Sequence, residues 1–434
     1  MANNLQILIL AAGKGTRMYS DMPKVLHKVI GTPMLDHVIT KAYSLKPKSI
    51  TVIINKNLLF LKKKYSNLKF LLQEPQLGTG HAVKIFQKQN KNRSSKLLVL
   101  YADNPLVNIN DLKKIKNELN KNDVVILGFK EINNSSYGII VQNKLGSVDQ
   151  IVEFKDASIE QKKIDICNSG IIALSSRSLN LINKIENNNM KKEYYLTDIV
   201  KLSKKYNYKI KLVTAVDSKT ALGINNMSEL GIAEKIMQNQ LRTKALKKGV
   251  SMIDPDTVYL SQDTFFGKNV VIEPFVVIGP KVKIGNGVVI RSFSHLEGTV
   301  IKNNVVIGPY ARIRPGTVLE NDTRVGNFVE IKNSKINKNS KINHLSYIGD
   351  TIMGKAVNVG AGTITCNYDG VKKYKTKIKS KAFIGSNSSL VAPVTVGKGS
   401  VVGAGSVITK NVSDNNLALT RSAQKNFKLK KRKN

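Results

Sequence analysis

The chain has 434 residues, too many for one ordinary hydrophobic core, so we expect two or more domains. Hydrophobic residues make up 41% and charged residues 23% of it, a balance that excludes an intrinsically disordered protein. The 69 Lys and Arg against 30 Asp and Glu give a formal net charge of +39, which alone is typical of proteins that bind nucleic acid or membrane surfaces.

The basic residues do not form a focused patch. They are spread along the chain and mixed with asparagines, as in KLSKKY and INKNSKIN, and only the tail KNFKLKKRKN is a continuous basic run. We interpret this tail as a solvated, poorly ordered terminus and expect no specific nucleic-acid partner. Tight, steeply salt-dependent binding to duplex DNA would instead support a nucleic-acid-binding module.

The sequence predicts a cytoplasmic protein without membrane insertion. No apolar run is long enough to span a bilayer, and the start MANNLQILILAAGKG has neither the basic region nor the cleavage site of a secretory signal. The only cysteines, Cys167 and Cys366, lie in different halves of the chain, which excludes a disulfide framework or a zinc site built from them.

Residues 1–226 alternate short apolar runs with helical patterns, which predicts an α/β domain with a mostly parallel sheet. A helix is predicted to start at Thr32–Pro33, because a Thr cap followed by Pro is a typical helix start. The strands expected here are Leu5–Leu10, Ser49–Ile54, Leu97–Tyr101, Val124–Phe129 and Ile171–Leu174, and the buried face of the helix is expected to carry Leu35, Val38, Ile39 and Ala42.

A second helix, from about Met227 to Lys248, is polar and rich in lysine at its end, and we interpret residues 227–249 as a linker helix. In residues 250–434 an aliphatic residue recurs every six positions, which predicts a three-sided coil with those residues inside. The repeats run through Phe266, Ile272, Ile278, Ile284, Ile290 and Leu296; then Ile301, Ile307, Ile313, Leu319, Val325 and Ile331; then Ile336, Ile342 and Ile348; and finally Ile378, Ile384, Leu390, Val396 and Val402.

Glycine often follows the inward residue of these repeats. We expect it where a bulky side chain or an ordinary φ would not fit. The positions are Gly279, Gly285, Gly308, Gly326, Gly385, Gly397 and Gly403.

The first predicted strand runs into LAAGKGTRM, where Gly13 and Gly15 let backbone N–H groups approach phosphate oxygens. The pattern is neither the dinucleotide fingerprint nor a Walker A loop. With DMPKVLHKVIGTPML, QEPQLGTGHA, YADNPL, SYGII, IVEFKDA, CNSG and GINN it resembles the nucleotide-sugar pyrophosphorylases, which have a Rossmann-like nucleotidyltransferase domain.

The resemblance implies that Asp103 and Asn225 hold Mg²⁺ and that Lys24 contacts the substrate phosphates. The loop's own cations, Lys14 and Arg17, are also expected to neutralise phosphate charge. In isolation, Asp103 would be interpreted as a loop carboxylate that caps the next helix. The implied UTP and UDP-sugar site comprises Leu10, Ala11, Ala12, Gly13, Lys24, Gln73, Gly78, Thr79, Tyr101, Ala102, Asp103, Gly138, Glu153, Asn168 and Asn225, with Gln73, Gly78 and Thr79 at the uracil and Gly138, Glu153 and Asn168 at the sugar.

Two residues depart from this family. Ala102 replaces the usual Gly beside the metal carboxylate, and Ile139 replaces a frequent Arg. Neither change removes a metal ligand, so we expect the activity to be retained, if reduced.

The repeat half resembles the acetyltransferase domain of the bifunctional UDP-N-acetylglucosamine pyrophosphorylase/glucosamine-1-phosphate N-acetyltransferases. The matching stretches are IGPYARIRPG, VGNFVEIKN, INHLSYIGD, VNVGAGTITCNYDG, FIGSNSSLVAPVTVGKGS and VGAGSVITKNV. The resemblance implies a left-handed parallel β-helix, a homotrimer with sites between subunits, and a role in peptidoglycan and lipopolysaccharide synthesis. The resemblance also implies the substrates UTP, N-acetylglucosamine 1-phosphate, glucosamine 1-phosphate and acetyl-CoA.

Spacing adds independent expectations for the second site. Arg314 and Lys332 are one turn of eighteen residues apart, so they are expected to stack as a cationic pair that suits a phosphate. Ser386 and Ala404 share that spacing and are expected to line a wall for the pantetheine arm. His344 lies where the repeat slips and is our candidate base for acetyl transfer.

The remaining assignments for this site come from the resemblance alone. Cys366 is interpreted as a bystander, because no general base is indicated for it. The implied residues are Tyr347 and Asn358 for the amino sugar, Asn367 and Tyr368 at the acetyl-transfer site, and Ala361, Ser386, Ala404 and Arg421 for acetyl-CoA.

The sequence thus favours a two-step enzyme of UDP-N-acetylglucosamine synthesis. The alternative enzyme is a sugar-nucleotide pyrophosphorylase in which the β-helix only trimerises the chain. Release of free coenzyme A from acetyl-CoA and glucosamine 1-phosphate distinguishes the two.

Overall fold

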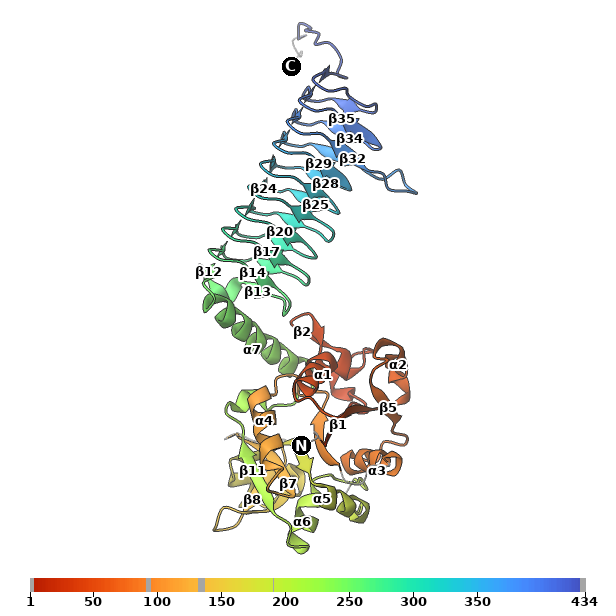
Figure 1. Ribbon diagram of the computed structural model, residues 1–434, viewed down its shortest axis with the longest axis vertical. Helices are drawn as coiled ribbons and strands as arrows, with labels where there is room; N and C mark the ends of the chain where they lie inside the picture. The colour runs from red at the N-terminus through yellow and green to blue at the C-terminus, as the bar shows by residue number, and fades with distance from the viewer. Residues whose placement is uncertain (1–3, 91–94, 132–136, 190, 430–434) are drawn as a thin grey trace, which may run out of the picture. The chain divides into compact units, whose positions relative to one another are not determined.

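A computed structural model describes residues 4–90, 95–131, 137–189 and 191–429. The chain forms two compact units, residues 1–235 and 236–434, which divide inside helix α7 (Met227–Leu246), the helix predicted as a linker. The first unit contains α/β structure and the second contains stacked coils (Figure 1). In the described part of the tail, residues 421–429 are exposed and lie outside helices and strands.

The main sheet of the first unit has the strand order β11-β7-β10-β6-β1-β4-β5. The central strands β1, β4, β5 and β6 are parallel, whereas β10 runs antiparallel to both of its neighbours. The strands are β1 (Leu5–Leu10), β4 (Ser49–Ile54), β5 (Lys69–Leu72), β6 (Lys96–Tyr101), β7 (Val124–Lys130), β10 (Ile166–Leu174) and β11 (Ile210–Thr214), with a hairpin of β8 (Ile139–Gln142) and β9 (Val148–Val152) beside β10.

The strand predictions are confirmed where the sequence is continuously apolar. The bounds of β1 and β4 agree with the prediction, and β6 and β7 are each one residue longer. The predicted Ile171–Leu174 is only the second half of β10. Its first half includes the polar Asn168 and Ser169 and a bulge that shifts the register, so the apolar pattern does not reveal it.

The predicted helix start at Thr32–Pro33 is wrong. Thr32 and Pro33 form the short strand β3, which pairs antiparallel with β2 (Lys28–Val29), and helix α1 begins at Met34 and ends at Ser44. The strand pairing takes Thr32 out of the cap position. The predicted buried face of α1 is confirmed, and the other α-helices of this unit are α2 (Leu61–Lys64), α3 (Thr79–Gln89), α4 (Ile109–Glu118), α5 (Ser176–Leu179) and α6 (Asp198–Lys205).

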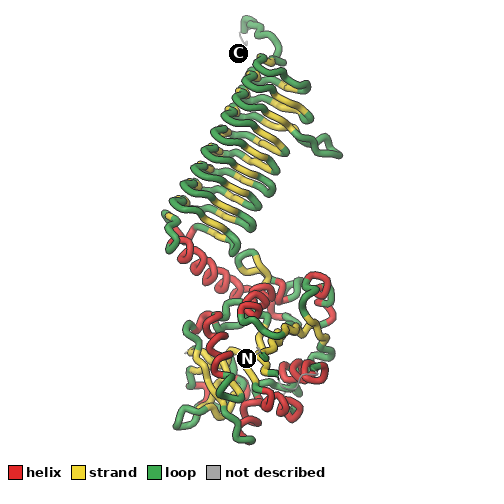
Figure 2. The backbone as a smooth tube through the Cα atoms, in the orientation of Figure 1, coloured by secondary structure: helices red, strands yellow, loops and turns green. Residues whose placement is uncertain are grey.

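The second unit is a parallel β-helix of short strands stacked coil above coil (Figure 2). In the described chain its three sheets have ten, nine and eight strands. They run from β12 (Ser251–Met252) to β38 (Leu417–Ala418), from β13 (Tyr259–Leu260) to β37 (Val407–Ile408), and from β14 (Phe265–Phe266) to β35 (Val394–Val396). The predicted inward residues are confirmed, since all form one core cluster and only Phe266 is partly buried.

Of the two reasons predicted for the glycines, the lack of room for a side chain is confirmed, and an unusual φ is found at only one of them. Only Gly308 among them has a positive φ, of 91°, whereas Cβ atoms on the others would meet the next coil. At Gly326 the Cβ would lie 1.9 Å from the carbonyl oxygen of Asn343, so close approach of the coils excludes a side chain there.

The left-handed backbone lies instead at one corner residue of each repeat, three positions after most inward residues. At one corner these residues are aromatic and stack with ring centroids 4.8–5.1 Å apart. They are Phe275, Phe293, Tyr310 and Phe328, with φ of 55–60°. Stacking of the rings offsets part of the strain of a left-handed non-glycine residue.

Candidate functional sites

The two predicted loops of the N-terminal site lie at the same edge of the sheet. Strands β1 and β6 are parallel neighbours with Leu10 opposite Tyr101, so the segments that follow them leave the sheet side by side. The backbone N–H of Ala102 donates to the carbonyl of Leu10 over 3.0 Å. This carboxyl edge is where open α/β sheets bind ligands.

The glycines of the first loop have different roles. Gly15 has a φ of 67°, and a Cβ there would lie 2.7 Å from the Cβ of Lys24, so Gly15 permits the Lys24 segment to pack on the loop. A Cβ on Gly13 would touch nothing within 4 Å. The loop is therefore open to a ligand at Gly13.

Four of the predicted residues converge beside this loop. The Lys24 ammonium pairs with the Asp103 carboxylate and also donates to Asn225 Oδ1 over 2.9 Å. Arg17 Nη2 donates to the same Asn225 oxygen, again over 2.9 Å. The Lys24 and Asp103 side chains are largely buried, so their charges interact more strongly than at an exposed surface.

The carboxylate of Asp103 and the amide oxygen of Asn225 suit Mg²⁺. This ion binds one or two protein oxygens and completes its shell with phosphates and water. Among the residues that the structure describes, no group of three or more His, Cys, Asp or Glu side chains could hold a metal ion. An ion held by these two oxygens would need further ligands from the nucleotide and water.

The predicted uracil residues lie together at the start of α3. Gln73 Nε2 donates to the carbonyl of Gly78 over 2.9 Å, and Thr79 Oγ1 accepts from the backbone of Leu196. Gly78 has a φ of 99°, and a Cβ there would lie 2.7 Å from the carbonyl oxygen of Tyr194. Because Gly78 has no side chain, the start of α3 can pack closely against the backbone of Tyr194.

A neighbouring cavity of about 410 Å³ includes residues that sequence reasoning missed. Asn55 and Gln76 donate to the carbonyl of Ala12 over 3.1 and 2.9 Å, which ties the glycine loop to the ends of β4 and β5. The cavity is lined by Lys14, Asn55, Lys56, Asn57, Glu74, Pro75 and Gln76.

The predicted sugar residues form a second group. The backbone of Asn168 donates to the carbonyl of Gly138 over 2.7 Å, and a Cβ on Gly138 would lie 3.7 Å from Glu153 Oε1. Burial raises the pKa of Glu153, with the Lys191 charge acting in the opposite direction. A carboxyl group so placed is suited to hydrogen bonds with sugar hydroxyls.

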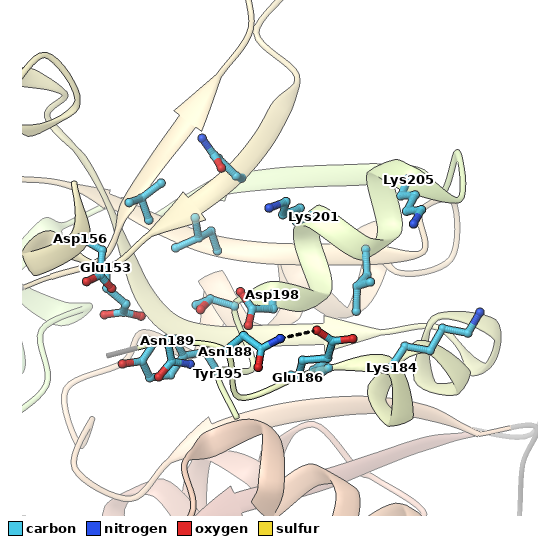
Figure 3. A pocket seen from close by; sticks show the side chains of 16 residues that line it. Glu153, Asp156, Lys184, Glu186, Asn188, Asn189, Tyr195, Asp198, Lys201 and Lys205 are labelled. Atoms are coloured by element: carbon cyan, nitrogen blue, oxygen red, sulfur yellow. Dashed lines mark hydrogen bonds between the residues drawn. The ribbon is translucent and has the colours of Figure 1, made fainter. Parts of the chain in front are cut away.

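Glu153 also lines a cavity of about 530 Å³ between β9 and α6 (Figure 3). Figure 3 shows Glu153 and Asp156 at one end and Lys184 and Lys205 at the other, with Asp198 between them. Burial raises the pKa of Asp198. Sequence reasoning singled out only Glu153 in this cavity and missed its other lining residues, among them Asp156 of the same matching stretch and Asp198 of α6.

The two departures from the family pattern are both buried. Ala102 and Ile139 each expose none of their surface. Ile139 pairs with Val152 of β9 and contributes to the core, so this position places no charge at the site. Ala102 keeps the backbone bond that joins β6 to β1.

In the β-helix, β22 (Arg312–Ile313) pairs with β25 (Glu330–Lys332) of the adjacent coil. Arg314 follows β22, and Lys332 is the last residue of β25. Arg314 Nη1 forms an ion pair of 2.7 Å with Glu330. The neighbouring Lys373 ammonium lowers the pKa of Lys332, and burial and the Arg314 charge act in the same direction. Three cations therefore gather here, and sequence reasoning missed Lys373 because it lies in a loop outside the repeat.

His344 is exposed at the end of β27 (Lys341–His344), opposite Asn327 of β24 (Arg324–Asn327). Its Nδ1 lies 2.7 Å from Asn327 Oδ1. An amide oxygen only accepts, so Nδ1 carries the proton and Nε2 is left as a base. Sequence reasoning missed Asn327.

Tyr347 and Asn367 lie close together above Gly349. A Cβ there would be 2.6 Å from the Tyr347 hydroxyl and 2.8 Å from Asn367 Nδ2. Asn367 donates to the carboxylate of Asp350, whose backbone N–H donates to the Lys332 carbonyl over 3.0 Å. Asp350, also missed from the sequence, thus joins these residues to the cationic group.

The predicted acetyl-CoA residues follow one another on successive coils. Strands β30 (Asn358–Val359), β33 (Phe383–Ile384) and β36 (Val401–Val402) pair in register, and Ala361, Ser386 and Ala404 come two positions after their inward residues. Arg421 Nη1 donates to the Ala404 carbonyl over 2.8 Å. Tyr368 is exposed and forms an isolated backbone β-bridge with Lys373. Asn358 is half-buried and lies opposite Lys341 of the adjacent strand.

Loop, sheet edge and stacked coils together define a two-domain transferase that joins a nucleotidyltransferase to a hexapeptide-repeat acyltransferase. Residues 7–150 match the MobA-like NTP transferase domain, and residues 263–298, 298–333 and 375–410 match the bacterial transferase hexapeptide (six repeats). No helix in the described ranges is long and apolar enough to cross a membrane.

Whole-length relatives agree with both halves. The chain is 45% identical to "Bifunctional protein GlmU" of Zymomonas mobilis, with 96% of this chain and 95% of that protein covered. The proteins of the same name from Bartonella bacilliformis and Ruegeria sp. are each 44% identical and cover 98% and 97% of this chain, and 95% and 94% of their own. The chain belongs to the GlmU family of bifunctional enzymes, which acetylate glucosamine 1-phosphate and then uridylylate the product to give UDP-N-acetylglucosamine.

Proposed function

We propose that the two reactions occur at the two sites described above, with uridylyl transfer in the first unit and acetyl transfer in the β-helix. The observation that carries the first assignment is the convergence of Arg17 and Lys24 on Asp103 and Asn225 beside the open glycine loop. Groups of both signs at one sheet edge suit a nucleoside triphosphate and its metal ion.

In the first reaction, a phosphate oxygen of N-acetylglucosamine 1-phosphate attacks the α-phosphorus of UTP. The new P–O bond gives UDP-N-acetylglucosamine, and the bond to the β-phosphate breaks with release of pyrophosphate. No protein nucleophile is needed, so Arg17 and Lys24 contribute by holding and neutralising the phosphates. Asp103 and Asn225 would hold Mg²⁺, which supplies further charge neutralisation there.

We place the sugar at Glu153 and its cavity, with Gly138 and Asn168 beside Glu153. The buried carboxyl group and the neighbouring polar side chains support this placement. We place the uracil at Gln73, Gly78 and Thr79, at the start of α3.

In the second reaction, Arg314, Lys332 and Lys373 hold the phosphate of glucosamine 1-phosphate. The amino nitrogen of glucosamine 1-phosphate forms the amide bond to the acetyl carbon, and His344 Nε2 takes a proton from that nitrogen. The thioester C–S bond breaks, and the coenzyme A thiolate leaves. The bond to Asn327 supports this role, because it fixes the tautomer that leaves Nε2 free.

The family resemblance further supports a cytoplasmic homotrimer with acetyl-transfer sites between subunits. Exposed His344 and Tyr368 are compatible with completion by a partner subunit. Light scattering of the purified chain tests this point, and a monomeric mass at working concentration would refute it.

One assay tests both assignments together. Glucosamine 1-phosphate, acetyl-CoA, UTP and Mg²⁺ are mixed with the chain, and UDP-N-acetylglucosamine is expected with one coenzyme A and one pyrophosphate per product. Pyrophosphate release from N-acetylglucosamine 1-phosphate without coenzyme A release from glucosamine 1-phosphate would instead favour the non-catalytic, trimerising β-helix.

A further inference from the structure

The N–H groups of Asn225, on its backbone and on its side chain, are bonded to the first turn of α7. Its backbone N–H donates to Glu229 Oε2 over 2.6 Å, and its side-chain Nδ2 lies 3.3 Å from that oxygen and from the Gly223 carbonyl. The other Glu229 oxygen accepts from Asn226 Nδ2 over 2.7 Å. One carboxylate therefore satisfies donors of both asparagines.

These bonds fix which end of the Asn225 amide faces the site. An asparagine amide carries a donor NH₂ at one end and an acceptor oxygen at the other. Because the NH₂ is directed to Glu229 and Gly223, the oxygen is directed to Arg17 and Lys24, where it accepts from both. A half-turn of the amide would direct hydrogen atoms toward the cations or a metal ion.

We propose that Glu229 is a positioning residue for uridylylation, which holds the Asn225 oxygen toward the bound metal ion. The inference rests on the proposed role of Asn225 as a metal ligand. Partners that orient a ligand commonly change metal affinity 10- to 100-fold when they are removed.

Glu229 also stabilises the start of α7, and this second role must be separated from the first. Its backbone N–H donates to Asn226 Oδ1 over 2.9 Å, a bond typical of a helix cap. Asn226→Ala removes this bond and the Asn226 Nδ2–Glu229 Oε1 bond, and it keeps both groups of the Asn225–Glu229 bonds. It is therefore the matched control for a purely structural effect.

The test uses the full chain and Mn²⁺ with UTP, since Mn²⁺ binding is followed by electron paramagnetic resonance without turnover. Glu229→Met is expected to weaken Mn²⁺ binding about tenfold or more. Glu229→Gln retains an acceptor for Asn225 and is expected to stay within about threefold of the original chain. Asn226→Ala is expected to lower the unfolding temperature by a few degrees and leave Mn²⁺ affinity unchanged.

Unchanged Mn²⁺ affinity in Glu229→Met would overturn the proposal, as would equal losses in Glu229→Gln or Asn226→Ala. If Glu229→Met does not fold, Glu229→Ala takes its place under the same criteria. Asn225→Ala separates the two levels of inference. If it leaves Mn²⁺ affinity unchanged, the ligand assignment itself fails; if it weakens Mn²⁺ binding and the Glu229 variants do not, only the positioning role fails.

Discussion

Arg314 and Lys332 occupy equivalent positions on adjacent coils, since the backbone N–H of Arg314 donates over 2.8 Å to the carbonyl of Ile331, the residue before Lys332. The eighteen-residue spacing predicted this stacking. It did not predict Glu330, which forms an ion pair with Arg314, or Lys373, which lies beside Lys332. A dianionic phosphate bound here would relieve the repulsion among the three cations.

Lys332→Met is therefore expected to raise the KM for glucosamine 1-phosphate about tenfold or more, because a charge-assisted hydrogen bond contributes about 1.5–3 kcal/mol. Coenzyme A release measured against substrate concentration gives this KM. Lys335→Met, an exposed lysine on the next strand, is the matched control and is expected to behave like the original chain. Equal KM values in all three proteins would remove Lys332 from the phosphate site.

His344→Ala is expected to lower the rate of acetyl transfer by about 10²–10⁴ and to leave UMP transfer intact, since positioned general bases contribute rates of this size. Asn327→Ala is expected to have a smaller effect, because it releases the ring without removing it. Separate assays of coenzyme A and pyrophosphate release measure the two reactions. Loss of both in His344→Ala would argue against separate sites.

Asp103→Asn is expected to reduce UMP transfer by at least about 100-fold, because a neutral amide binds both Mg²⁺ and the Lys24 ammonium less strongly. Acetyl transfer is expected to continue at the original rate. Asp21→Asn makes the same chemical change at an exposed position of the same unit and serves as the control. If Asp103→Asn retains the pyrophosphate release of that control, Asp103 is not required for UMP transfer.

The sequence predicted most reliably what depends on periodic or continuous apolar residues. Strands β1 and β4 and the inward residues of the β-helix belong to this class, because burial alone determines them. Residues such as Asn327, Asp350 and Lys373 were missed because they are polar and meet their partners only through coil stacking or a loop. Glu229 was missed because its role depends on the side-chain rotamers around Asn225.

Lys41 gives the first unit a predicted pH dependence of stability. It lies on α1, one turn after the buried His37, and its ammonium donates to the carbonyl of Pro105. Burial lowers the pKa of Lys41 from 10.5 to about 8. Burial also lowers the pKa of His37, and the Lys41 charge acts in the same direction.

Below pH 8 both the folded and the unfolded chain hold the Lys41 proton, so the full cost of burying the charge is present. Between pH 8 and 10.5 the unfolded chain still binds the proton that the folded chain has released, so this contribution to stability rises with pH. Lys41→Met removes the cost. It is expected to stabilise the first unit at pH 7 by about 2–3 kcal/mol, less about 1 kcal/mol for the lost bond to Pro105.

This advantage of Lys41→Met over the original chain is expected to shrink steadily from pH 8 to pH 10.5. Urea unfolding of both full-length proteins at pH 7, 8, 9 and 10 measures the difference in their free energies of unfolding. The unfolding transition of the β-helix serves as the internal reference, because Lys41 belongs to the first unit. A difference between the two proteins that stays constant over this range would show that Lys41 keeps its proton in the folded chain, because a group with the same proton occupancy in both states contributes no slope.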